Sequence, residues 1–144
     1  MLKYFFSLRF EYYDERSGEK LYNGFGLGYY SSLTLAIRRR EEMSSLPGFC
    51  LHPISCFKIK RVRVVFESDI VDKAKVSLFV LTHECEKDEY DIVTDFGAFS
   101  SYEKAHEQLE KYKFHKFYRL YPEGFVIDKH NVNRCNEWSE GFSS

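Results

Sequence analysis

An internal repeat constrains the fold of this chain more than any other feature of its sequence. The pattern glycine, any residue, aromatic, two serines, three variable residues and alanine occurs as GYYSSLTLA at 28–36 and as GAFSSYEKA at 97–105. With an offset of 69 residues (97 minus 28), seven positions are identical between Leu27–Pro53 and Phe96–Pro122. The match crosses a turn, a helical pattern and the start of a strand, which indicates one unit used twice. Two copies of this length are not typical of a solenoid array.

Each repeat predicts the order strand, strand, helix, strand. The strand patterns are rich in aromatic and β-branched residues; they lie at Tyr4–Tyr12, Leu21–Gly28 and Phe57–Phe66, and at Val76–Cys85, Tyr90–Phe96 and Gly124–Val132. The double serine opens each helix, and Ser100 with Glu103 fits a capping box. The first helix is expected to end by Leu46, because a Pro-Gly pair follows it.

The predicted fold class is α+β, with two tandem β-β-α-β units packed as one domain over residues 1–144. The repeats span 1–66 and 76–132, a linker spans 67–75, and an ordered tail spans 133–144. A unit of this size is marginal alone, so we expect one antiparallel or mixed sheet with both helices on one face. The tail is polar, and its Trp138 is expected to pack back over the core.

The composition indicates a well-packed protein. Hydrophobic residues make up 44% and aromatic residues 18% of the 144 positions, which argues against disorder. No apolar run is long enough to span a bilayer, and Arg9 and Glu11 interrupt the N-terminal one, so we expect a cytoplasmic protein without a membrane partner. The four cysteines form no Cys-x-x-Cys motif, which favours free thiols.

The second repeat carries four distinctive segments. They are Phe79–His83 (FVLTH), Gly97–Ala105 (GAFSSYEKA), Tyr121–Asp128 (YPEGFVID) and Trp138–Phe142 (WSEGF). Over residues 76–142 the chain thereby resembles a family of short, uncharacterised bacterial domains. The first repeat departs from it, since it lacks Glu-Gly-Phe after its proline and has no Trp. The whole chain looks like a small immunity protein of a bacterial toxin–immunity pair, and this resemblance implies no catalytic residues.

Motifs for catalysis, metals and cofactors are weak. Cys50 with His52, and His83 with Cys85, have the spacing that presents two soft ligands together on a strand. Nothing in the sequence joins the two pairs, so buried cysteines and ordinary histidines are the favoured interpretation. The glycines in 24–28 lack the Gly-Lys-Ser/Thr ending of a phosphate loop. We therefore expect no enzyme, no metal and no cofactor.

An acidic cluster in the first turn of the second repeat is the candidate partner-binding site. Its members are Glu84, Glu86, Asp88, Glu89, Tyr90, Asp91 and Asp95. A solvated loop is the simple interpretation. The functional one is a docking site for a cationic partner, most concretely a toxin domain such as a nuclease, with Tyr90 as an aromatic anchor. The predicted function is a non-enzymatic protein that blocks a toxin's active cleft.

Basic residues support an alternative, a regulator that binds nucleic acid. The candidate residues are Arg38, Arg39, Lys58, Lys60, Arg61 and Arg63. Lys58 and Lys60 share one side of the predicted third strand, opposite Phe57 and Ile59. The net charge of −1 argues against this alternative, because nucleic-acid binders usually carry a basic excess. A further alternative is a structural scaffold module.

Overall fold

The computed structural model describes residues 1–16, 18–69, 72–135 and 137–143. Contacts within the chain define two compact units. Unit 1 consists of Met1–Lys3, Arg63–Asp72 and Val76–His130, and unit 2 consists of Tyr4–Val62, Lys73–Lys75 and Asn131–Ser144. The prediction of a single domain stays a prediction. Ile70 and Val71 of the predicted linker and Asn136 and Ser144 of the predicted tail lie outside the described residues.

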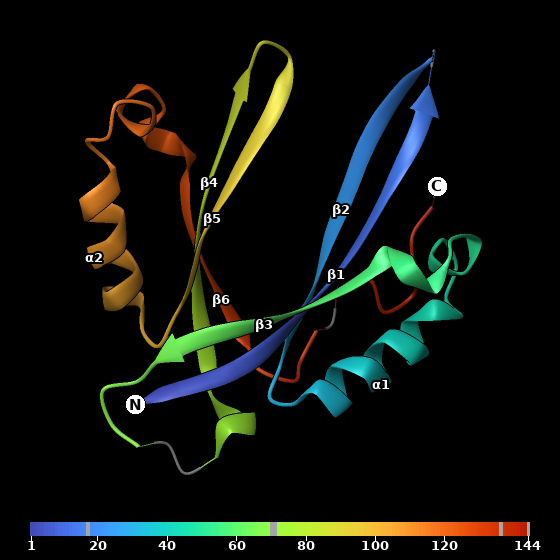
Figure 1. The fold of residues 1–144 in the computed structure, drawn as a ribbon, viewed down its shortest axis with the longest axis horizontal. Helices are drawn as coiled ribbons and strands as arrows, with labels where there is room; N and C mark the ends of the chain where they lie inside the picture. Colours follow the sequence, from blue (N-terminus) through green and yellow to red (C-terminus); the bar gives the residue numbers. More distant parts are fainter. Residues whose placement is uncertain (17, 70–71, 136, 144) are drawn as a thin grey trace. The chain divides into compact units, whose positions relative to one another are not determined.

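The elements follow the predicted order in both halves, and the fold class is α+β (Figure 1). They are β1 (Leu2–Arg16), β2 (Glu19–Tyr30), α1 (Leu33–Ser44), β3 (Phe57–Val65), β4 (Ser77–Lys87), β5 (Tyr90–Phe99), α2 (Tyr102–Tyr112) and β6 (Phe125–Asn131). Short 3-10 turns precede β3 and β6, at Phe49–Leu51 and Ile54–Cys56 and at Tyr118–Leu120 and Pro122–Gly124.

The prediction of one shared sheet is wrong. The strands form two three-stranded sheets, with the orders β2-β1-β3 and β5-β4-β6. In each half the third strand returns to pair with the first strand of the same half, so its backbone hydrogen bonds are satisfied locally. Each sheet also packs against the helix of its own half, which lets the apolar stripe of that helix be buried without a common sheet.

The two hairpins share the same pairing register. The β1–β2 pair Tyr13 with Tyr22 corresponds to the β4–β5 pair Glu86 with Asp91, and the β1–β2 pairs from Phe6 with Tyr30 to Asp14 with Leu21 correspond with the same offsets. The first hairpin is longer by two pairs, Glu15 with Lys20 and Arg16 with Glu19. Both ladders shift register directly before corresponding residues, between Ser7 and Arg9 in β1 and between Leu81 and Thr82 in β4. At this bulge Gly28 and Gly97 have φ values of 101° and 106°, which only glycine adopts readily.

The second serine of each motif is the N-cap of the helix that follows it. Ser32 Oγ accepts a hydrogen bond from the Leu35 amide at 3.2 Å, and Ser101 Oγ accepts one from the Lys104 amide at 3.1 Å. The predicted capping box at Ser100 is therefore wrong. The cap lies one residue later, at Ser101, so the third helical position is Lys104 and not Glu103. Glu103 is therefore not placed to accept a hydrogen bond from the backbone amide of the N-cap residue. The end of α1 at Ser44 agrees with the predicted stop before Leu46.

Aromatic rings fill the core of unit 2. Phe10 lies 4.9 Å from the Phe49 ring and 4.8 Å from the Phe57 ring. The C-terminal tail joins this cluster, because Trp138 stacks on Phe25 at 4.5 Å. The tail thus packs back on a core, as its Trp predicted. Among the described residues, neither helix has the length and apolar character that a membrane span requires.

Candidate functional site

The β4–β5 hairpin gathers four carboxylates on one face. Glu84 pairs with Val93 and Glu86 with Asp91, and residues directly opposite each other in an antiparallel ladder point to the same side. Asp95, opposite Thr82, alternates onto this side as well. His83 and Cys85 point the other way and are buried. We call Glu84, Glu86, Asp91 and Asp95, all exposed, together with Val93, the acidic face.

The apolar side chain among the carboxylates is Val93, not Tyr90. Val93 is 61% exposed and directly faces Glu84 across the ladder. Tyr90, although 74% exposed, pairs with Lys87 and therefore lies on the opposite side of the hairpin. Val93 was not among the predicted site residues, because strand alternation identifies a shared face only when the register between two strands is known.

The charges of the acidic face are not compensated. Glu86 lies directly opposite Asp91, and like charges in this arrangement are destabilising. Within the described part of the chain, none of the four carboxylates forms an ion pair. Asp95 accepts a hydrogen bond from the Gly97 amide at 2.8 Å. Lys87, the basic residue of the hairpin, lies on the other side, with Nζ 6.0 Å from the Phe117 ring.

Two further acidic residues form the tip of the hairpin. Asp88 and Glu89 make a two-residue turn with φ values of 55° and 68°. Turns of this kind favour glycine at the second position, because a side chain in the left-handed region is sterically unfavourable. Glu89 occupies that position, whereas Gly18, with φ 81°, lies in the tip of the first hairpin. The tip therefore carries a charge where the backbone favours glycine.

The matching face of the first hairpin has a different chemistry. With the offsets of the two ladders, the positions of the acidic face correspond to Glu11, Tyr13, Tyr22, Gly24 and Gly26. A hairpin with the same register thus forms with one carboxylate at these five positions. It follows that the backbone arrangement does not require the cluster of acids.

His83 belongs to the core of unit 1. Its side chain is 0% exposed, and Nε2 lies 2.9 Å from the carbonyl oxygen of Tyr121. Among the described residues Nδ1 has no hydrogen-bond partner. A Cβ at Gly124 would lie only 2.6 Å from Nε2, so the turn Tyr121–Phe125 closes over the imidazole because it contains glycine. His83 and Gly124 thus have a structural role in packing the turn against β4, which the sequence did not reveal.

Metal ligation gains no support from the cysteines. Cys50 is exposed while Cys85 is buried, and all four cysteines are free. His52 lies 4.3 Å from the ring of Tyr12. The described residues contain no group of three or more His, Cys, Asp or Glu side chains placed to hold a metal ion. The expectation of no metal and no cofactor stays a prediction.

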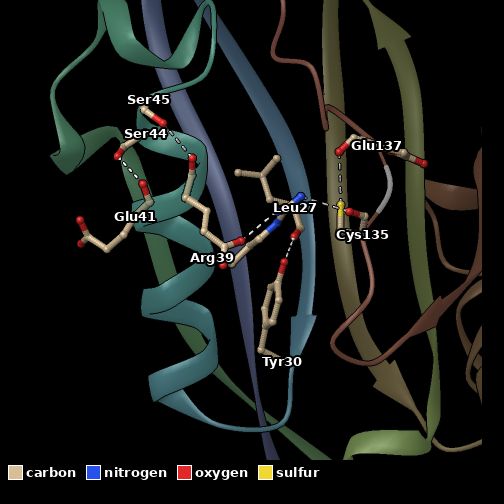
Figure 2. A network of polar contacts seen from close by, with 9 residues as sticks. Leu27, Tyr30, Arg39, Glu41, Ser44, Ser45, Cys135 and Glu137 are labelled. Carbon is tan, nitrogen blue, oxygen red and sulfur yellow. Dashed lines mark hydrogen bonds and ion pairs between the residues drawn. The ribbon is translucent and has the colours of Figure 1, made fainter.

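Arg39, one of the basic candidates, takes part in an internal polar network of unit 2. Its Nη1 donates to Glu42 at 3.1 Å. Figure 2 shows it reaching from α1 towards Cys135, where Nη2 donates to the carbonyl oxygen at 3.3 Å. In the same network the Tyr30 hydroxyl donates to the Leu27 carbonyl oxygen at 2.7 Å, and burial raises the pKa of Tyr30 to about 12. Arg39 is thus used to hold α1 and the tail.

The other basic candidates are exposed. Lys58 and Lys60 lie on the solvent side of β3, opposite the buried Phe57, as the alternation predicted. Arg61 lies over the ring of Tyr4, with its guanidinium carbon 4.5 Å from the centroid. Arg38 and Arg63 are exposed as well. Their role in binding nucleic acid stays a prediction.

Comparison with known proteins gives one match. Residues 76–141 match the model of a family described as a domain of unknown function (DUF7336). A short domain of uncharacterised function therefore covers the second repeat and most of the tail, in agreement with the resemblance seen in the sequence. No curated protein and no solved structure matches the chain.

Proposed function

We propose that this protein is a non-enzymatic inhibitor that binds a cationic protein through its acidic face. The observation that carries the proposal is the directly opposed pair Glu86 and Asp91, which no described residue compensates. A pair of like charges that lowers the stability of a hairpin is expected to persist where a partner of opposite charge relieves the repulsion. Glu89 at the tip, in an unfavourable backbone region, supports the same interpretation.

The partner that best fits this chemistry is a bacterial toxin, and the protein acts as its immunity protein in the bacterial cytoplasm. A toxin that cleaves nucleic acid needs a basic cleft, because its substrate is a polyanion. The carboxylates of the acidic face would occupy the phosphate positions, and Val93 would contact an apolar group between the toxin's cations. The inhibitor blocks substrate access and performs no chemistry.

The two halves are proposed to be tandem copies of one β-β-α-β unit. The shared hairpin register, the two glycine bulges and the two serine caps support a duplication. After duplication, one copy is free to diverge while the other keeps its packing role. The acidic face is then a feature acquired by the second copy.

Charge reversal tests this proposal. The triple variant Glu84→Lys, Glu86→Lys, Asp91→Lys should slow association with the toxin encoded beside this protein by at least about tenfold at low salt, because electrostatic steering is lost. Inhibition of the toxin should weaken in parallel. Surface plasmon resonance at two salt concentrations measures the association rate.

The matched control reverses Glu103, Glu107 and Glu123, exposed carboxylates of the same unit outside the acidic face. It makes the same change in net charge and should leave the association rate within about twofold of wild type. Equal association rates for wild type and the acidic-face variant would exclude the acidic face as the docking site.

A further inference from the structure

A second charged surface of unit 1 follows α2. Between Lys111 and Pro122 the chain contains no Asp or Glu, but it contains Lys111, Lys113, Lys116 and Arg119. Lys111, Lys116 and Arg119 are exposed and form no ion pair with any described residue. This segment was not among the predicted sites, although its run of basic residues interleaved with aromatic ones is visible in the sequence. We call Lys111–Leu120 the basic turn.

The basic turn presents apolar side chains beside its cations. Phe114 is 75% exposed and Leu120 is 67% exposed. The Lys113 ammonium lies 5.0 Å from the centroid of the Phe114 ring. An aromatic face open to solvent and flanked by cations is the arrangement with which proteins bind single-stranded nucleic acid, since a base stacks on the ring while the phosphates meet the cations.

The backbone of the basic turn is held in place. The His115 amide donates to the Tyr112 carbonyl oxygen and the Arg119 amide donates to the His115 carbonyl oxygen, both at 2.9 Å. Tyr112 packs on Phe96 at 4.8 Å, and Tyr118 packs on His83 at 4.8 Å. The turn is therefore anchored by its inward side chains. Lys113 is paired with Glu110, while the outward Lys111, Phe114, Lys116 and Arg119 are exposed to a ligand.

The first repeat shows that the fold does not need these outward residues. With the offset of 69, Tyr112 and Tyr118 correspond to the fully buried Met43 and Phe49, so the inward positions keep their role. The outward positions Lys111, Lys113, Phe114, Lys116 and Arg119 correspond to Glu42, Ser44, Ser45, Pro47 and Cys50. The same turn thus forms without any of the cations or the exposed ring.

We propose that the basic turn is a binding site for single-stranded nucleic acid. A duplex offers no free base face to Phe114, and an acidic peptide would satisfy the cations without using the ring. The site lies on the side of the β5-β4-β6 sheet that carries His83 and Cys85, opposite the acidic face. The proposal therefore does not depend on the inhibitor function, and each surface is tested by its own residues.

Fluorescence anisotropy with a labelled oligouridylate of about 12 nucleotides tests the site on the full chain. Binding is expected at about 50 mM salt, and the affinity should fall by about 20- to 50-fold at about 200 mM, as three or four phosphate contacts predict. The variant Lys116→Glu, Arg119→Glu should lose at least about tenfold in affinity at low salt. Phe114→Ala should lose about tenfold with an unchanged salt slope, because the ring contributes stacking and no charge.

Matched controls separate the site from general charge effects. Lys20→Glu, Arg134→Glu makes the same change in net charge at exposed positions of unit 2, and Tyr13→Ala removes a ring of a residue that is 68% exposed; neither should change the affinity by more than about twofold. No binding at low salt, or an equal loss in both charge variants, would overturn the proposal. Binding to vesicles with anionic lipids is measured as well. Phe114-dependent binding to the vesicles without binding to RNA would contradict the proposal and assign the basic turn to a membrane surface.

Discussion

Among single residues, Gly124 shows most clearly how closely a turn of this protein packs against a strand. An added Cβ would lie 2.5 Å from the Glu84 carbonyl oxygen and 2.6 Å from His83 Nε2, and neither of these groups is the loose end of an exposed chain. In the first repeat Cys56 precedes Phe57 as Gly124 precedes Phe125, and Phe10 stands at the ladder position of His83. The glycine is thus needed because the turn lies directly against the imidazole and the β4 backbone.

Gly124→Ala is expected to lower the free energy of unfolding by about 1–3 kcal/mol, the usual effect of forcing an atom into a packed site. Urea denaturation followed by circular dichroism measures this change. Gly26→Ala is the control, since its Cβ would meet only the Arg9 guanidinium at 3.9 Å and the effect should be below about 1 kcal/mol. A loss as large in Gly26→Ala would show that the close approach at Gly124 is not the cause.

At the scale of elements, the β4–β5 hairpin has a regular ladder up to its turn but carries residues that destabilise it locally. Its ladder continues to a two-residue turn, yet Glu89 has φ 68° and Glu86 faces Asp91. The first hairpin, with Gly18 in its tip and Tyr13 facing Tyr22, avoids both problems. We therefore expect stability and partner binding to oppose each other in this element.

Glu89→Gly should raise the free energy of unfolding by about 1 kcal/mol, because it removes a side chain from the left-handed region. The same variant should slow association with the partner, since it removes a charge from the tip. Thermal denaturation and surface plasmon resonance measure the two effects. Glu103→Gly in the first turn of α2 makes an identical substitution but should destabilise, because glycine disfavours helix. An unstabilised Glu89→Gly protein would contradict this account of the turn.

At the scale of the whole molecule, the compact units do not coincide with the two halves of the sequence. Asn131–Ser144 belongs to unit 2, although it follows the second repeat. Its residues take part in the core there: Trp138 stacks on Phe25, and Phe142 lies 4.8 Å from Phe49. Asn133 also accepts a hydrogen bond from the Ser31 amide at 2.8 Å. The match to the domain family therefore covers residues of both units.

Truncation after Val132 tests the role of the tail. The loss of Trp138 and Phe142 from the aromatic cluster should destabilise unit 2 by about 3–5 kcal/mol. Hydrogen exchange should show faster exchange of the amides in β1 and β2, while those in β4 and β5 stay protected. A chain ending at Phe142 keeps both rings and should behave as the full chain does. Unchanged protection of β1 and β2 in the shorter chain would refute this role.

The sequence alone determined the α+β fold class and the order of the elements, because these follow from local patterns. Alternation places Lys58 and Phe57 on opposite sides of a strand, and a Pro-Gly pair ends α1 wherever the helix packs. The exposed acidic hairpin could also be found this way, since a run of carboxylates favours solvent.

Only the tertiary structure decided which residues meet across strands. The pairing of the third strand within its own half produced two sheets, and the register brought Val93 rather than Tyr90 among the carboxylates. The burial of His83 beneath Gly124 and the use of Arg39 to hold the tail are likewise contacts between distant positions. The physical reason is that strand pairing and side-chain packing depend on residues far apart in the chain, which no local periodicity encodes.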